Sequence, residues 1–217
     1  TSQHEFVSDL SFQYESRESI DVNYEVPTGK RGKRHSLGNE LVLGFKNPEG
    51  ASIEFIFRAH NDGVAYRYKL LGEGEVEVIG EASGFAVAEE RDAFIANYDF
   101  GGVFFSGTYE QIYQYQESGS QTTKGGFAYP ALFDVDNDNW VLITEADVDE
   151  NYCGTRIGEN PGPRVYRVRF PNPDDGNGIG EVFPKAMLPL RTPWRVAILG
   201  TLATVVQSTL VTDLSTP

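Results

Sequence analysis

The chain has 217 residues, of which 40% are hydrophobic and 12% aromatic, enough to build one β domain with a substantial core. Its formal net charge of −14 argues against nucleic acid as a partner, because the phosphates would be repelled. No apolar run approaches the roughly 20 residues of a membrane span, so we expect no membrane partner either. The sequence shows neither a start methionine nor a signal sequence, so we expect a mature or excised segment.

The clearest predicted element is a hairpin in residues 52–70. Aromatic and aliphatic side chains, Phe55 and Phe57 among them, alternate there with polar ones, as in a half-buried strand. Asp62 and Gly63 then supply a turn before the return strand. We therefore expect a hairpin with one aromatic face in the core.

Shorter runs of the same kind occupy much of the remaining chain, and Gly, Pro, Asn and Asp lie between them. Helical periodicity is nearly absent, and only residues 107–116 are compatible with either a helix or a strand. We expect Trp194 to be buried as an anchor of the sheet. The pattern predicts an all-β fold, a single β-sandwich domain over residues 1–217. Further strands are expected in residues 39–45, 74–80, 140–143, 164–170, 194–200 and 204–211.

A carboxylate ends one of these predicted strands. Val141, Ile143 and Glu145 are spaced two apart, so their side chains share one face of the strand. That face is apolar until it reaches Glu145. The carboxylate therefore lies either at the solvated rim of the core or opposite a group that requires a negative charge.

Other residues of chemical interest have simpler explanations. Cys153 is the only cysteine, so it forms no disulfide within the chain, and we expect a small packed residue. Three alternating acids resemble a calcium loop but lack its glycine at the sixth position and its glutamate at the twelfth, which favours a polar hairpin tip. These acids are Asp134, Asp136 and Asp138.

Histidines and aromatic residues leave two further hypotheses open. A mutarotase-like site would combine histidines with a carboxylate, but the three histidines lie far apart in the sequence and nothing selects a pair. Sugars stack on aromatic rings, so aromatic side chains near turns could form a carbohydrate platform, although most aromatics of a β protein fill the core. The histidines are His4, His35 and His60, and the platform would comprise Tyr109, Tyr113, Tyr115, Phe127 and Tyr129.

Four segments in one order resemble the N-terminal domain of glycoside hydrolase family 97. The hairpin segment FRAHNDGVAYRY is similar to the family's Arg-Ala-x-x-Asp-Gly-x-Ala-x-Arg-Tyr motif, and RTPWRVAILG to its Thr-Pro-Trp-Arg-Val signature. GKRGKRHSLGNEL resembles a family segment that ends in Asn-Glu-Leu, and LITEADVDENYCG resembles the Glu-Ala…Tyr-x-Gly stretch. The four occupy residues 29–41, 57–68, 142–154 and 191–200.

This resemblance implies a two-sheet β-supersandwich similar to galactose mutarotase. It implies a parent α-glycosidase acting on α-linked oligosaccharides, either α-glucosides or α-galactosides, with Ca²⁺ in its active site. The family's catalytic carboxylates belong to a (β/α)8 barrel that follows this domain, so no catalytic residue is assigned to this chain, and the family's first strands would precede Thr1. One calcium-binding glutamate comes from the N-terminal domain, and Glu145 matches it by motif.

The same resemblance implies that the barrel is a partner within the same polypeptide, that this chain alone is inactive, and that the bacterial parent is periplasmic or secreted. Two alternatives remain open. The chain could be a free-standing carbohydrate-binding module, or a mutarotase-like sugar epimerase that uses histidine and glutamate.

Overall fold

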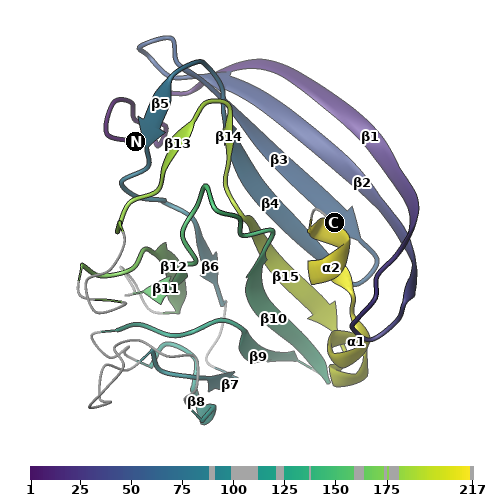
Figure 1. Cartoon of the computed structure of the whole chain (residues 1–217). Coiled ribbons are helices and arrows are strands. Elements are labelled where there is room, and N and C mark those ends of the chain that lie inside the picture. The colour runs from purple at the N-terminus through teal and green to yellow at the C-terminus, as the bar shows by residue number, and fades with distance from the viewer. Residues whose placement is uncertain are drawn as a thin grey trace.

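The structure is a computed structural model, and it describes residues 1–87, 91–98, 112–120, 125–136, 138–158, 164–173, 175 and 181–215. Antiparallel strands make up most of the described chain, and two short helices follow the last strand (Figure 1). The all-β prediction is therefore confirmed. The strands are β1 (Ser11–Glu25), β2 (Lys33–Lys46), β3 (Ser52–His60), β4 (Gly63–Leu70), β5 (Glu75–Glu77), β6 (Gly84–Ala86), β7 (Asp92–Ile95), β8 (Gln114–Glu117), β9 (Ala131–Asp136), β10 (Asn139–Ala146), β11 (Arg156–Gly158), β12 (Val165–Arg169), β13 (Lys185–Met187), β14 (Leu190–Arg191) and β15 (Trp194–Gly200).

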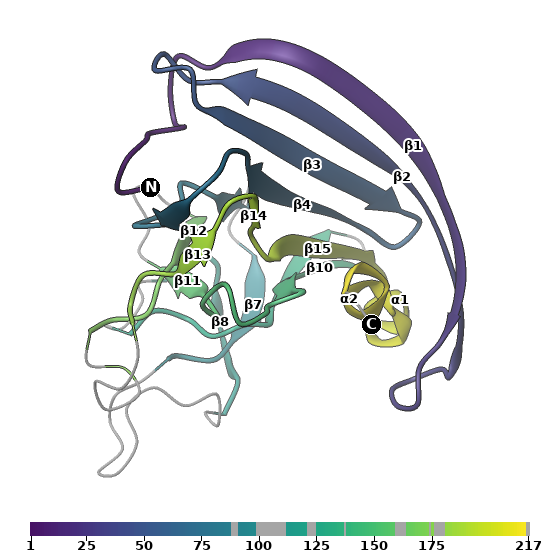
Figure 2. The same cartoon turned by 45° about the horizontal axis from the view of Figure 1, so that its top comes forward.

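One ten-stranded sheet organises the molecule. Nine strands follow the order β1-β2-β3-β4-β15-β10-β9-β7-β8, and β14 pairs with β4 beside them. The strands β1 and β2 arch over the rest as a long outer pair (Figure 2). Two small sheets, β11-β12-β6 and β13-β5, complete the described strands. The second layer of the sandwich is thus built from small sheets.

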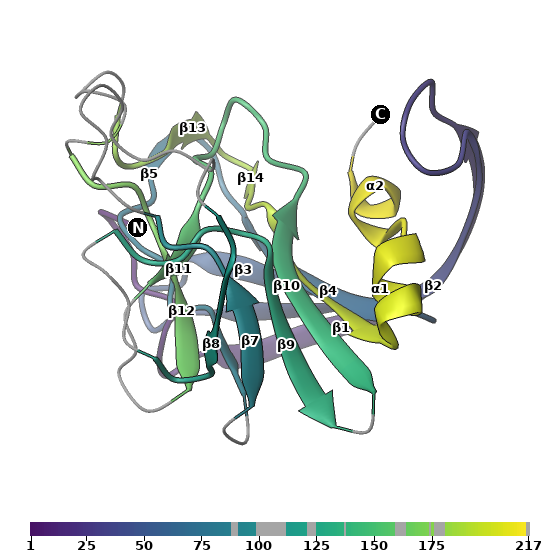
Figure 3. The same ribbon diagram turned by 90° about the horizontal axis from the view of Figure 1, so that it is seen from below.

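The two faces of the large sheet are covered differently. We call face A the side that carries Ile53, Leu70 and Ile143, because these side chains pack against residues of the two small sheets. Face B carries Trp194 and Val196, which pack against the two helices. The helices lie against one side of the sheet near β15 and β10 (Figure 3).

The predicted hairpin is confirmed in β3 and β4. Their register runs from Ile53 opposite Leu70 to the last pair at Gly63, with a two-residue turn between the strands. A side chain at Gly63 would place its Cβ 2.5 Å from the carbonyl oxygen of Ala197, so the adjacent strand β15 requires glycine there. The turn residue and the close approach of β15 together explain the Asp-Gly pair.

The expected burial of the hairpin's aromatic face is only partly correct. Phe55 and Tyr68 are half-buried and pack against the core cluster beneath β5 and β13. Phe57, however, is 38% exposed. The more deeply buried face is the opposite one, with Ile56 and Ala65 in contact with the cluster around Trp194. The small sheets of the second layer do not extend over Phe57, which accounts for the difference.

The prediction of a strand in residues 204–211 is wrong. This segment forms parts of α1 (Leu202–Gln207) and α2 (Leu210–Leu214). The Thr201 side chain caps α1 by accepting a hydrogen bond from the backbone N–H of Thr204 at 3.2 Å. Val205 and Leu210 are buried on face B, so packing overrides the β propensity of the Thr-Val-Val run. No helix of the described residues is long and apolar enough to cross a membrane.

The segment 107–116 is only partly described. Residues 107–111 lie outside the described residues, whereas Gln114–Glu117 form β8 and pair with β7. The part of the segment that has regular structure in the described residues is therefore a strand.

Trp194 is confirmed as a buried anchor, and its replacement provides a test of the core. It is 0% exposed, and the guanidinium groups of Arg58 and Arg67 lie 4.8 and 4.2 Å from its ring. Trp194→Ala should lower the free energy of unfolding by about 3–5 kcal/mol, as truncation of a large core aromatic does. Denaturant melts measure this loss, and the half-buried Trp140 is the matched control. A loss at Trp194 no larger than that of Trp140→Ala would contradict the assignment.

Candidate functional site

The strand β10 places Glu145 as the alternation predicted. Val141, Ile143 and Glu145 all point to face A, where Ile143 is buried in a core cluster that Val141 joins. The Glu145 side chain is only 11% exposed. The carboxylate therefore lies at the rim of the core rather than on an open surface.

The group opposite Glu145 is a buried arginine. The register of β10 against β15 pairs Glu145 with Arg195, and Nη1 of Arg195 donates to Oε2 of Glu145 at 2.7 Å. Arg195 is 0% exposed. Its other donors reach Glu81, with Nε 2.8 Å from Oε1 and Nη2 2.5 Å from Oε2. This bidentate contact is the strong form of an arginine–carboxylate pair.

Neighbouring polar groups complete the cluster. Thr155 donates to Glu145 twice, from its backbone N–H to Oε1 at 2.9 Å and from its hydroxyl to Oε2 at 2.7 Å. The Tyr152 hydroxyl donates to Oε2 of Glu81 at 3.2 Å. We call Glu81, Glu145, Thr155 and Arg195 the arginine cluster. One cation there compensates two buried carboxylates, each with further hydrogen bonds.

The electrostatics of the cluster follow from burial and this pairing. Burial by itself would lower the pKa of Arg195, but the hydrogen bond and charge of Glu81 outweigh it and raise the pKa above its ordinary value. Burial raises the pKa of Glu145, opposed by the charge of Arg195 and the bonds from Thr155. Arg195 is therefore held firmly in its charged form.

Calcium fits Glu145 only as a partial ligand. A carboxylate has about four lone-pair positions, and Thr155 and Arg195 occupy three of them at Glu145. A calcium ion requires six to eight oxygens. No group of three or more His, Cys, Asp or Glu that could hold a metal occurs among the described residues. Glu145 as one ligand of a larger calcium site, with other oxygens supplied from elsewhere, stays a prediction.

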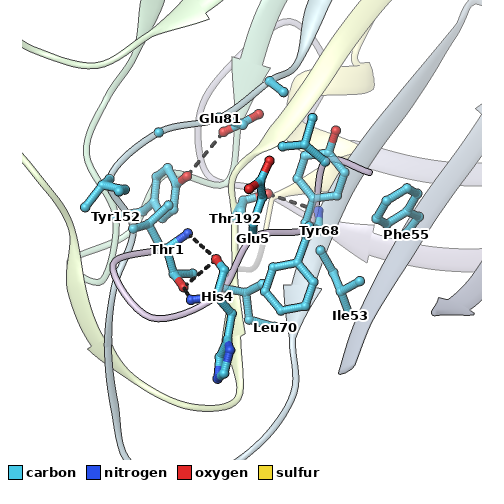
Figure 4. Close-up of a pocket in the computed structure, with 16 residues that line it drawn as sticks. Thr1, His4, Glu5, Ile53, Phe55, Tyr68, Leu70, Glu81, Tyr152 and Thr192 are labelled. Carbon is cyan, nitrogen blue, oxygen red and sulfur yellow. Dashed lines mark hydrogen bonds between the residues drawn. The ribbon is translucent and has the colours of Figure 1, made fainter. Parts of the chain in front are cut away.

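A pocket of about 460 Å³ adjoins the arginine cluster (Figure 4). Its wall is mainly apolar and comes from face A of β3 and β4 and from the N-terminal segment. Glu81 and Tyr152 lie together on one side of it, joined by their hydrogen bond (Figure 4). Because Glu81 is also bound to Arg195, the pocket has no free carboxylate from the cluster for acid–base chemistry.

The histidines do not form a common site. Nδ1 of His4 lies 2.6 Å from Oε2 of Glu49, and Nε2 of His35 lies 2.7 Å from Oδ1 of Asp21. His60 ends β3 at the hairpin turn. His4 lines the pocket that Glu81 also lines. His4 is already bonded to Glu49, and Glu81 to Arg195, so the two do not form a histidine–carboxylate pair. The mutarotase-like hypothesis therefore gains no support from the geometry.

The proposed aromatic platform is divided between core and surface. Phe127 and Tyr129 are buried in the cluster of face A, whereas Tyr115 is 63% exposed and Tyr113 is exposed as well. Tyr109 lies outside the described residues. The core role favoured for aromatics of a β protein is therefore confirmed for Phe127 and Tyr129, and the alternative of a shared sugar-binding surface is excluded for these two rings.

The remaining sequence candidates have structural roles. Asp134 and Asp136 belong to β9, and Asp138 follows in the tight turn to β10, so the hairpin-tip interpretation is confirmed. Cys153 is half-buried, and burial raises the pKa of its thiol to about 12. The thiol is therefore a poor nucleophile, as expected for a packed residue.

Comparison with known proteins identifies the domain. The sequence model of the family described as Glycosyl-hydrolase 97 N-terminal matches residues 1–217. The chain belongs to this family. The resemblance seen in the four sequence segments is thereby confirmed.

Relatives of this family 97 N-terminal domain are much longer. A probable retaining alpha-galactosidase of Streptomyces bingchenggensis is 29% identical over 92% of this chain and 28% of its own length. A retaining alpha-galactosidase of Bacteroides thetaiotaomicron is 25% identical over 86% of the chain and 30% of its own length. The chain thus spans less than a third of these curated relatives.

Solved structures agree with the fold. The crystal structure of a beta-arabinopyranosidase has a TM-score of 0.86 and 31% identity, covering 93% of this chain and 33% of its own. A family 97 enzyme from a Pseudoalteromonas species, in complex with panose, has a TM-score of 0.79 at 20% identity, covering 96% of this chain and 30% of its own. At that identity the second likeness concerns the fold alone.

Sequence reasoning found Glu145 but missed its partners. Arg195 is part of the segment RTPWRVAILG, where a charged residue occupies a position flanked by apolar ones in a predicted strand. That signal could have identified a buried charge, since such a charge needs a partner of opposite sign. Glu81 and Thr155 lie outside regular strands, and no pattern marks them.

Removal of Arg195 tests whether the cluster is a buried ion network. Arg195→Met leaves Glu81 and Glu145 buried without their cation, so the free energy of unfolding should fall by about 3–5 kcal/mol. Lys69→Met is the matched control, because Lys69 forms a partly exposed pair with Glu54 at 3.0 Å and should cost about 1 kcal/mol or less. Equal losses in denaturant melts would contradict the special role of Arg195.

Proposed function

We propose that this chain is the non-catalytic N-terminal domain of an α-glycosidase and that it packs on a (β/α)8 catalytic barrel in the same polypeptide. The observation that carries the proposal is that both buried carboxylates of the arginine cluster, one of which lines the pocket, are paired with the same guanidinium. Glu81 and Glu145 are both bound to Arg195, so neither is free to act as acid, base or nucleophile. Glycoside hydrolysis ordinarily requires two carboxyl groups placed across a sugar.

The names of the relatives support a substrate class for the whole enzyme. Two curated relatives are named retaining alpha-galactosidases, and a structural relative at 31% identity is named a beta-arabinopyranosidase. An α-D-galactopyranoside and a β-L-arabinopyranoside have the same ring configuration and differ by the exocyclic CH2OH group. We therefore propose that the whole enzyme removes sugar residues of this configuration from the non-reducing end of its substrate. By the family resemblance, we also propose that it is exported from a bacterial cell.

Activity measurements on two lengths of chain test this function. Residues 1–217 alone should release no nitrophenol from nitrophenyl α-galactoside, β-L-arabinopyranoside or α-glucoside, since Glu81 at the pocket is bound to Arg195 and the catalytic carboxyl pair is expected from the barrel. The full-length protein should cleave one or both of the first two. Circular dichroism would establish that the short chain is folded. Turnover by the short chain, abolished by a substitution within it, would refute the proposal, and sugar binding or anomer interconversion by the short chain would favour one of the two alternatives.

Glu145 can be tested separately as a calcium ligand. The single lone pair left on its carboxylate supports at most one contact to the ion, so residues 1–217 alone should bind Ca²⁺ no more tightly than millimolar. In the full-length protein, Glu145→Gln should weaken the rise in melting temperature that Ca²⁺ produces. Titration calorimetry of the short chain and thermal melts of the long one measure these effects. Micromolar binding by the short chain, or an unchanged calcium response in the variant, would contradict the assignment.

A further inference from the structure

One row of side chains crosses the large sheet on face A and changes from buried to open. Neighbouring strands place Glu145, Arg195, Tyr66, Phe57 and Leu41 opposite one another, in that order, from β10 to β2. The row is buried at Arg195, beneath the second layer. Tyr66 is half-buried, and its ring lies 6.3 Å from that of Phe85 on β6. Beyond Tyr66 the described residues of the second layer no longer cover the sheet.

The open part of this row is apolar and hollowed. We call it the outer face, and it comprises Leu41, Phe57, Val64 and Tyr66. Phe57 is 38% exposed and Val64 46% exposed. A groove of about 610 Å³ runs over all four residues. A second hollow of about 330 Å³ adjoins it and shares Phe57 and Tyr66. Contiguous exposed apolar surface of this kind marks a site of contact.

The charges around the groove limit what can occupy it. The chain as a whole carries a net charge of −14, but the charged residues of the groove are two arginines and two glutamates. Arg58 and Glu40 pair with each other at 2.7 Å on face B, where Arg58 lies over the Trp194 ring. On the side of the outer face, Arg17 pairs with Glu15 at 3.5 Å. The groove therefore has no surplus charge to attract an ion, and an apolar occupant with a few polar groups at its edge fits it best.

We infer that the outer face is a docking surface for a further apolar segment of the same, longer polypeptide, an inference that rests on the proposed function. Face A is already the side on which this fold packs its second layer, so the outer face continues an existing packing surface across β4, β3 and β2. Relatives of the domain are about three times its length, which supplies such a segment. A segment in the same chain also has a high effective concentration at the surface.

Cysteine labelling of the full-length protein tests this directly. Val64→Cys is compared with Val22→Cys, each in a Cys153→Ala background, because Val64 and Val22 are 46% and 50% exposed strand valines in this structure. If the outer face is covered, a maleimide should react with the cysteine at position 64 at least about tenfold more slowly than with that at 22. Equal rates would overturn the inference, as would a reading frame that ends with residue 217.

Two further measurements test whether the outer face is instead occupied by a second copy of the protein or by a carbohydrate. Protection at position 64 that appears only where light scattering detects self-association would identify a second copy of the protein and overturn the inference. Protection that requires an added galacto-oligosaccharide would identify a carbohydrate site and overturn it too. If the cysteine variants fold poorly, Val64→Glu should lower the melting temperature of the full-length protein by about 5 °C or more, and Val22→Glu by about 1 °C. Equal shifts would overturn the inference.

The labelling result is independent of catalysis. A full-length protein that is protected at position 64 but cleaves no glycoside would refute the proposed function and leave the docking surface standing. A full-length protein that cleaves glycosides but is freely labelled at position 64 would refute the docking surface and leave the proposed function standing.

Discussion

The ion network of Arg195 is the constraint on which the joining of the two layers depends. Arg195 lies on the large sheet, yet its partners come from three separate places. They are Glu145 on the adjacent strand, Glu81 on the loop between β5 and β6, and the hydroxyl of Thr155, which accepts from Nη1 at 3.1 Å. Thr155, just before β11, completes the bonding of Glu145. A buried guanidinium is tolerated only when it is paired and hydrogen-bonded, so the strand, the loop and the β11 segment must reach their places together.

The same network also specifies register. A slip of β15 by one residue would move Arg195 to face B, where the side chains of α1 and α2 pack, and away from Glu81. An apolar residue at position 195 would carry no such penalty for the wrong register. Buried ion pairs contribute little net stability compared with apolar packing, so specificity of pairing is the better account of why a charge lies in this position.

The sequence predicted those features that depend on interactions between residues close together in the chain. The alternation through Ile143 and Glu145 gave the correct face, and Asp62 gave the correct turn, because strand period and turn chemistry act over a few residues. Gly63, however, is the first residue of β4, and it is glycine because β15 approaches it closely. Residues 204–211 were misassigned because their β-branched side chains favour a strand, whereas the Thr201 cap and the packing of Val205 and Leu210 on face B select helices. The partners of Glu145, Thr155 and Arg195, are 10 and 50 residues away in sequence and depend on tertiary structure.

Face A is covered by the second layer in one part of the domain and exposed in another. Near β10 and β15 the face is closed, and its carboxylates are satisfied by groups of the same domain. At the end of β3 and β4 near the hairpin turn, and on β2 beside it, the same face is open and apolar, with Phe57 and Val64 exposed. A domain that performed chemistry by itself would be expected to combine a hollow with unsatisfied polar groups. Among the described residues, the exposed side chains of the outer face are apolar and the two buried carboxylates are bound to Arg195, an arrangement in keeping with the proposed role of a supporting domain.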